Sequence, residues 1–263
     1  NIMRVDIVEK KEFIDMINKV YPNIELKNIN GITIDSRKVK KDDIFIPIKG
    51  KSNDGHSFIH QVEALGGILL FSEKNISSYK KKYKKVKSNK NELMNLANMW
   101  IDRFQPKIIA ITGSNGKTTV KDMLHHIISK EKNTMKSFKN FNSTVGLPLS
   151  LFNLNKNHEI IILEMGADRN GEIESLVKVA PPNYAAITNI NNSHNKYFGN
   201  IENIALNKMK IFKYLNKDDY AFINLDDINI RPIEKKYNTI TFSFNKYLSD
   251  FNADLITSSK KYK

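Results

Sequence analysis

The segment from Thr112 to Thr119 reads TGSNGKTT and brings together groups that bind phosphate. Glycines let backbone N–H groups close around phosphate oxygens. A lysine adds positive charge near the outer phosphates, and the hydroxyl that follows it can hold Mg²⁺. The segment therefore predicts binding of ATP or GTP, through Gly113, Ser114, Asn115, Gly116, Lys117, Thr118 and Thr119.

The spacing of this segment differs from the usual G-x-x-x-x-G-K-[ST] pattern, because Ile111 stands where the first glycine would be. An apolar run, Ile108–Ile111, precedes the segment, and a helical pattern, Val120–Ser129, follows it. Strand, glycine loop and helix is the layout in which a helix N-terminus faces an anion. An ordinary strand-to-helix turn does not need two glycines, a lysine and two hydroxyls in this order, so the pattern favours phosphate binding.

Two further polar residues follow apolar runs and are candidates for the same site. Glu164 closes the run Ile160–Leu163, and Asn189 lies near the end of the run Tyr184–Ile190. A carboxylate at the end of a buried strand suits Mg²⁺. The structural alternative for Glu164 is a helix cap or a salt-bridged strand end.

Lys208 and His194 stand in places that allow both a structural and a functional interpretation. Lys208 falls on the apolar stripe of the helical pattern 201–215, four residues after Ile204. An inward lysine usually snorkels or pairs with an acid, and its ammonium has no lone pair for Mg²⁺. His194 lies in the loop after Ile190, where a surface role and a ligand role both remain open.

The elements that must position these residues predict an α/β fold. The first region, residues 1–90, reads as a small α/β domain, and an amphipathic helix over 91–106 connects it to the rest. From residue 107 to 263, strands alternate with helices, which predicts a mostly parallel sheet with ligands at the carboxyl ends of its strands. The expected helices are 13–20, 58–65, 91–106, 120–129 and 201–215. The expected strands are 31–35, 44–48, 67–71, 108–112, 160–165, 184–190, 220–224, 239–244 and 253–257. Residues 88–91 are expected to form a polar surface stretch.

Composition excludes several classes. The 263 residues are 40% hydrophobic and contain no cysteine, so disulfide and thiolate chemistry are excluded. No run approaches about 20 apolar residues, so no membrane span is expected, and a cytoplasmic protein is the simplest interpretation. The net charge is +14, but the lysines are scattered and accompany many Asn and Ile residues, so nucleic-acid binding is not favoured.

Four sequence blocks make the chain similar to the Mur ligases, and within them to the branch that adds D-alanyl-D-alanine to a peptidoglycan precursor. Together they span nearly the whole chain. The blocks are Asp35–Gly50 with Asp54–His56, Thr112–Thr119, Asn140–Leu149, and the set Leu163–Ala167, Gly171–Ile173, Ile187–Ile190, Ser193–His194, Phe198–Gly199 and Lys208–Phe212.

The resemblance implies a reaction and its partners. ATP, Mg²⁺, UDP-MurNAc-tripeptide and D-Ala-D-Ala would give UDP-MurNAc-pentapeptide, ADP and phosphate through an acyl phosphate. The resemblance also implies a further, Rossmann-like C-terminal domain that these residues do not include. The isolated chain is therefore expected to lack full ligase activity, and a monomer is expected.

The resemblance also implies a role for each candidate residue. Lys117 would hold the β- and γ-phosphates. The metal ligands would be Thr118, Glu164, His194 and Lys208, the last in carbamylated form, which would make Lys208 a carboxylate-like ligand. The substrate residues would be Asp35, Ser36 and Arg37 near the uridine diphosphate, and Asn142 and Ser143 near the muramoyl or phosphate region.

Two alternatives remain open at this stage. One is a related ligase, either the one that adds the third amino acid or a folylpolyglutamate-type enzyme. The other is a non-catalytic remnant that binds a nucleotide or a precursor.

Overall fold

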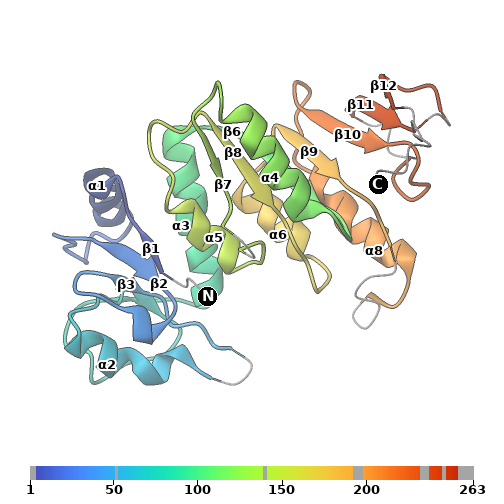
Figure 1. The fold of residues 1–263 in the computed structure, drawn as a ribbon. Helices are drawn as coiled ribbons and strands as arrows, with labels where there is room; N and C mark the ends of the chain where they lie inside the picture. The colour runs from blue at the N-terminus through green and yellow to red at the C-terminus, as the bar shows by residue number, and fades with distance from the viewer. Residues whose placement is uncertain are drawn as a thin grey trace, which may run out of the picture. The chain divides into compact units, whose positions relative to one another are not determined.

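A computed structural model describes residues 4–50, 53–138, 141–191, 198–231, 237–244 and 247–253. The chain divides into two compact units. The first comprises residues 1–106 and 128–161, and the second comprises residues 107–127 and 162–263. Figure 1 shows an α/β fold in both.

The first unit contains a small sheet with the strand order β1-β2-β3. Strand β1 (Arg4–Asp6) pairs antiparallel with β2 (Gly31–Thr33), and β2 pairs parallel with β3 (Ile44–Phe45). Strands β4 (Phe71–Ser72) and β5 (Lys84–Lys85) form a separate parallel pair. The strands expected near residues 31–35 and 44–48 are confirmed in shorter form. The strand expected at 67–71 is displaced, because β4 shares only Phe71 with it, and β1 and β5 were not predicted.

The helices of the first unit are α1 (Lys10–Val20), α2 (Ile59–Ala64), α3 (Asn89–Phe104) and α5 (Gly146–Leu151), with 3-10 turns η1 (Ser36–Lys38) and η2 (Gly55–Phe58). Aromatic rings fill the core: the Phe13 ring lies edge-on to Trp100 at 5.2 Å and to Phe152 at 5.7 Å. Strand β7 (Thr134–Lys136) also belongs to this unit.

The expectation of a polar surface stretch at residues 88–91 is wrong. Ser88 is the N-cap of α3, and its hydroxyl accepts a hydrogen bond from the Asn91 N–H at 3.2 Å. Asn89 is fully buried in the first turn of the helix. Because serine satisfies the free N–H groups of a helix start, this polar run begins a helix instead of covering the surface.

The second unit is built on the part of a larger sheet in which the strands lie in the order β12-β11-β10-β9-β6-β8. The strands are β6 (Lys107–Thr112), β8 (Ile160–Glu164), β9 (Tyr184–Ile187), β10 (Tyr220–Asn224), β11 (Asn238–Ser243) and β12 (Phe251–Asn252). The pairs β6·β9, β9·β10, β10·β11 and β11·β12 are all parallel. The predicted parallel sheet is confirmed. The strand expected at 253–257 falls mostly outside the described residues.

The helices of this unit are α4 (Lys117–Ile128), α6 (Glu172–Val179) and α8 (Ile201–Lys208), which is followed by the 3-10 turn η3 (Met209–Phe212). The single helix expected over 201–215 is therefore wrong in its second half. Its apolar stripe is real, because Ile204, Ala205, Ile211 and Phe212 are all buried. A change from α-helix to the tighter 3-10 turn keeps the stripe pointing inward over a short length.

No helix within the described ranges is long and apolar enough to cross a membrane.

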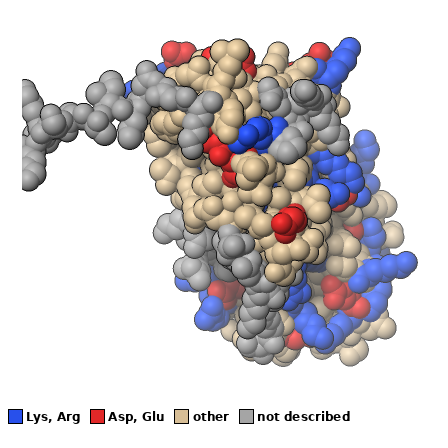
Figure 2. Space-filling model, turned by 90° about the vertical axis from the view of Figure 1, so that its right-hand side faces the viewer, with Lys and Arg blue, Asp and Glu red and all other residues tan. Residues whose placement is uncertain are grey.

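On the face drawn in Figure 2, lysine and arginine side chains lie among acidic and uncharged residues.

Candidate functional site

The loop between β6 and α4 has the backbone of a phosphate-binding loop. Strand β6 ends at Thr112 and α4 begins at Lys117. Gly113 has φ 147° and Gly116 has φ 80°, values that side-chain-bearing residues rarely adopt. The two glycines therefore allow the chain to turn from strand to helix while the N–H groups of the first helical turn face outward, ready for an anion.

Gly113 also lies against another segment. A Cβ atom built on it would overlap the Thr188 hydroxyl, whereas a Cβ on Gly116 would meet nothing within 4 Å. The absence of a side chain at 113 thus permits close approach of the loop to the residues that follow β9.

Substituting Gly113 by alanine is expected to lower the free energy of unfolding by roughly 2–4 kcal/mol, because backbone strain and a steric clash add. Gly116→Ala is the matched control, with strain but no clash, and should cost about 1 kcal/mol. Urea unfolding of the two variants measures both values. Equal losses at the two positions would show that the contact with Thr188 has no energetic weight.

The segment after β9 braces the phosphate-binding loop. The Asn189 amide oxygen accepts from the Asn115 N–H at 3.1 Å, and its Nδ2 donates to the Asn115 carbonyl at 3.2 Å. The Thr188 hydroxyl donates to the same carbonyl at 2.6 Å. Ser114 joins the brace through its hydroxyl, which accepts from the Asn191 N–H at 2.9 Å. Asn189 was expected to contact the nucleotide. In the structure its side chain forms hydrogen bonds with the backbone of Asn115 in the loop.

Two lysines meet at one carbonyl of the loop. The Lys117 ammonium donates to the Gly113 carbonyl at 2.8 Å, and the Lys208 ammonium donates to the same oxygen at 3.2 Å. Lys208 is 5% exposed. Burial first, and then the nearby Lys117 charge, lower the pKa of Lys208 to about 8, while Asp168 acts in the opposite direction. The structure thus brings together the two lysines that the sequence singled out.

A hydroxyl and a carboxylate lie beside the start of α4. The Thr118 hydroxyl donates to Glu164 Oε2 at 2.7 Å, and Glu164 is 3% exposed at the end of β8. Oxygen ligands of this kind suit Mg²⁺. Within the described ranges no group of three or more His, Asp or Glu residues could hold a metal. His194, the remaining predicted ligand, lies outside the described residues.

The first unit holds a separate pocket of about 510 Å³. Its lining includes three residues that the resemblance assigned to substrate, Asp35, Ser36 and Arg37, together with Phe58 and Gln61. The Asp35 carboxylate caps the η1 turn and accepts two hydrogen bonds from the Arg37 guanidinium, both at 2.8 Å. Because the Arg37 side chain is 82% exposed, its remaining N–H groups face water.

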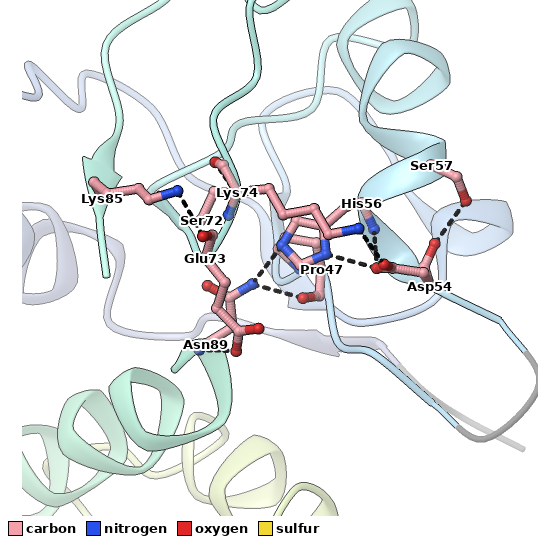
Figure 3. A network of polar contacts seen from close by, with 9 residues as sticks. All are labelled: Pro47, Asp54, His56, Ser57, Ser72, Glu73, Lys74, Lys85 and Asn89. Carbon is pink, nitrogen blue, oxygen red and sulfur yellow. Dashed lines mark hydrogen bonds and ion pairs between the residues drawn. The ribbon is translucent and has the colours of Figure 1, made fainter. Parts of the chain in front are cut away.

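A polar network lies next to the part of the pocket lined by Gly55, and Figure 3 shows it. Gly55 lines the pocket, and its neighbour His56 is buried. The His56 Nδ1 lies 2.6 Å from Asp54 Oδ1, and its Nε2 lies 3.1 Å from the Asn89 amide nitrogen. That nitrogen also donates to the Pro47 carbonyl at 2.7 Å, so Nε2 accepts and Nδ1 donates.

The Asp54 carboxylate ties this network to the surface. It accepts from the Lys74 ammonium at 2.6 Å, and Lys74 first and His56 second hold its pKa well below the usual range. The network therefore fixes the turn that carries Gly55. Its members, among them His56 and Asn89, were not predicted as site residues, although the Asp54–His56 block was part of the resemblance.

The other two predicted substrate residues, Asn142 and Ser143, precede helix α5. The Ser143 hydroxyl accepts from the Gly146 N–H at 3.1 Å, so this side chain caps the turn that leads into α5. Ser143 is exposed and Asn142 is half-buried.

Two family models match the chain. Residues 111–263 match the Mur ligase middle domain, and residues 28–103 match the model described as Mur ligase family, catalytic domain. The chain belongs to the Mur ligase family. The middle-domain match covers more than half of the chain and begins one residue before β6 ends, so the phosphate-binding loop lies inside it.

Comparison with named proteins shows which members of the family this chain is similar to. A UDP-N-acetylmuramoyl-tripeptide--D-alanyl-D-alanine ligase from Bacillus subtilis is 36% identical over 208 residues, which are 78% of this chain and 45% of that protein. A similarly named ligase from Escherichia coli is 30% identical over 94% of this chain and 55% of its own length. This Mur ligase chain thus spans about half the length of the curated relatives it matches.

Solved structures agree with the sequence comparison. The Thermotoga maritima MurF ligase in complex with ADP has a TM-score of 0.76 at 33% identity and covers 81% of this chain and 50% of its own. A MurF structure from Acinetobacter baumannii has a TM-score of 0.80 at 29% identity and covers 87% of this chain and 52% of its own. The Mur ligase fold expected from the sequence is confirmed.

Proposed function

We propose that the protein is an ATP-dependent amide ligase that joins D-Ala-D-Ala to UDP-MurNAc-tripeptide. The observation that carries the proposal is the convergence of Lys117 and Lys208 on the Gly113 carbonyl, at the loop where Thr118 contacts Glu164. The names of the relatives support the substrates. The folylpolyglutamate-type alternative does not account for the Asp35–Arg37 block.

The proposed chemistry has two steps. The terminal carboxylate of the tripeptide attacks the γ-phosphorus of ATP, so that a new O–P bond forms, the bond to the β-phosphate oxygen breaks and ADP leaves. The dipeptide amine then attacks the acyl carbon of the acyl phosphate, phosphate leaves with its bonding pair, and the nitrogen loses a proton. Phosphorylation replaces a poor leaving group by a good one.

In this proposal the chain positions the reactants and neutralises charge. The N–H groups at the start of α4 and the Lys117 ammonium would hold the outer phosphates. Lys117 now donates to the carbonyls of Gly113 and Ser114, at 2.8 and 3.2 Å, and would exchange these for phosphate oxygens. The brace from Thr188 and Asn189 would keep the loop open for the nucleotide.

Mg²⁺ fits the oxygen donors of Thr118 and Glu164, and His194 is proposed as a further ligand. When bound, Mg²⁺ would reduce the negative charge of the phosphates. Lys208 would serve as its carbamate, in which the lysine nitrogen has formed a bond to the carbon of CO₂ and lost a proton. The carbamate is anionic, so a buried inward lysine would become an oxygen ligand.

The pocket around Asp35, Ser36 and Arg37 is proposed to bind the uridine diphosphate end of the precursor, with Asn142 and Ser143 toward the muramoyl or phosphate region. This assigns residues 1–90 to the precursor, 91–106 to the connection and 107–263 to ATP. We propose that the protein acts in the cytoplasm, where ATP and nucleotide-linked sugars are found. A monomer is proposed as its oligomeric state.

Arg37→Met is expected to weaken binding of UDP-MurNAc-tripeptide about tenfold, since one charge-assisted hydrogen bond is lost. ADP affinity should stay unchanged. Lys38→Met, the neighbouring exposed lysine that does not line the pocket, is the matched control. Titration calorimetry measures both ligands. Equal weakening in the two variants would show a general charge effect and would refute the pocket assignment.

The function is tested by offering the complete protein ATP and Mg²⁺ with either UDP-MurNAc-tripeptide and D-Ala-D-Ala, or single amino acids together with UDP-MurNAc-tripeptide or a precursor one residue shorter. Phosphate release that requires the dipeptide is the expected result. Release with a single amino acid on a shorter precursor would assign the protein to the ligase that adds the third residue. No release with any acceptor would indicate a non-catalytic binding protein.

A further inference from the structure

Helix α4 buries a lysine. Among its described residues, Lys121 is the one that is buried, with 1% exposure, whereas Met123 and Ile127 on the same helix are each 60% exposed. Lysine is almost never fully buried unless its ammonium is paired, because removing a charge from water is costly. The position therefore calls for an explanation that apolar packing does not supply.

The partner of Lys121 is the carboxylate proposed as a metal ligand. Lys121 Nζ lies 3.6 Å from Glu164 Oε2, and the two side chains are 2% and 4% exposed. Asp122 Oδ1 lies 3.9 Å from the same ammonium, but its side chain is 49% exposed, so water screens that pair. The buried pair is the stronger one, because little water intervenes to screen it.

Glu164 Oε2 thus faces two groups at once. The Thr118 hydroxyl donates to it at 2.7 Å, and the Lys121 ammonium provides a positive charge at ion-pair distance. Lys117 and Lys208 differ in this respect, because their ammonium groups donate to the Gly113 carbonyl. Lys121 therefore forms the ion pair with the Glu164 carboxylate, whereas Lys117 and Lys208 bond to the loop backbone.

We propose that Lys121 is a positioning residue that makes divalent-cation binding at Thr118 and Glu164 depend on bound nucleotide. The ammonium neutralises the carboxylate, so a cation without nucleotide finds little net negative charge there. Phosphate oxygens would supply the missing charge. This inference rests on the proposed nucleotide site but not on the identity of the ligase substrates.

The test measures Mn²⁺ binding to the complete protein without nucleotide, by electron paramagnetic resonance of the free ion. Lys121→Met and Lys121→Gln remove the charge, and the glutamine keeps a hydrogen-bond donor at this buried position. Both variants are expected to bind Mn²⁺ at least tenfold more tightly than the native protein. Lys121→Arg, which keeps the charge, should bind Mn²⁺ as the native protein does.

Two further measurements decide how the effect arises. Adding Glu164→Gln to the Lys121→Gln variant should abolish the gain, because the gain acts through that carboxylate. With ADP present, the difference between native protein and Lys121→Gln should shrink. Unchanged or weaker Mn²⁺ binding in the charge-removing variants would overturn the proposal, as would a gain that survives Glu164→Gln. None of these measurements uses the ligase substrates, so failure of the proposed ligase reaction would be seen separately.

Discussion

Lys117→Met is expected to lower the affinity for ATP at least about a hundredfold, because several charge-assisted hydrogen bonds to phosphate are lost, each worth roughly 1.5–3 kcal/mol. The ammonium lies over the Gly113 and Ser114 carbonyls at the loop, so its charge is already at the site before phosphate arrives. Methionine keeps the length of the side chain without the charge.

The matched control is Lys130→Met, which changes an exposed lysine just beyond the end of α4. Fluorescence titration with a labelled adenine nucleotide measures both variants. An ATP affinity of Lys117→Met within threefold of the native value would contradict the assignment of this loop to the outer phosphates.

Lys208→Ala is expected to lower turnover about 10²–10³-fold, the usual effect of removing one group that stabilises transition-state charge. ADP affinity should change much less, because the lysine is proposed to act through the metal and the transferring phosphate. Added bicarbonate should not restore the variant, which lacks the amine that forms the carbamate. The measurement is steady-state phosphate release beside nucleotide titration. Unchanged turnover in Lys208→Ala would refute the role.

Whether Lys208 is carbamylated can be measured directly. Carbon-13 NMR of native protein in labelled bicarbonate should show a carbamate resonance that Lys208→Ala lacks. Burial favours this reaction, because only the neutral amine attacks CO₂ and a pKa lowered to about 8 raises the fraction of Lys208 that is neutral. A spectrum without the resonance would leave Lys208 as a cation and would contradict its role as a ligand.

Much of the second unit could be predicted from local sequence. The apolar run before Thr112, the glycines and the helical pattern 120–129 each extend over a few residues. They predict β6, the loop and α4, although α4 begins three residues earlier than expected, at Lys117. The inward position of Lys208 was also predictable, because the apolar stripe of α8 and η3 places it inside.

The contacts of the loop were not predictable, because they join residues far apart in sequence. From sequence alone, Lys121 would be assigned to the exposed face of its helix. Its burial depends on the ion pair with Glu164, which lies far away in the sequence. The side chains of Thr188 and Asn189 bond to the backbone N–H and carbonyl of Asn115, and backbone groups carry no residue-type signal. Asn89 is a polar residue that the sequence predicts to be exposed. It is buried because its amide donates a hydrogen bond to the Pro47 carbonyl, 42 residues earlier in the chain.

The central claim is that the tripeptide carboxylate takes the γ-phosphoryl group of ATP before the dipeptide amine attacks. The most direct test supplies the complete protein with UDP-MurNAc-tripeptide labelled with oxygen-18 in its terminal carboxylate, together with ATP, Mg²⁺ and D-Ala-D-Ala. The account predicts one labelled oxygen in each inorganic phosphate released, and one pentapeptide precursor for each ADP. Unlabelled phosphate, or label recovered in AMP, would contradict it.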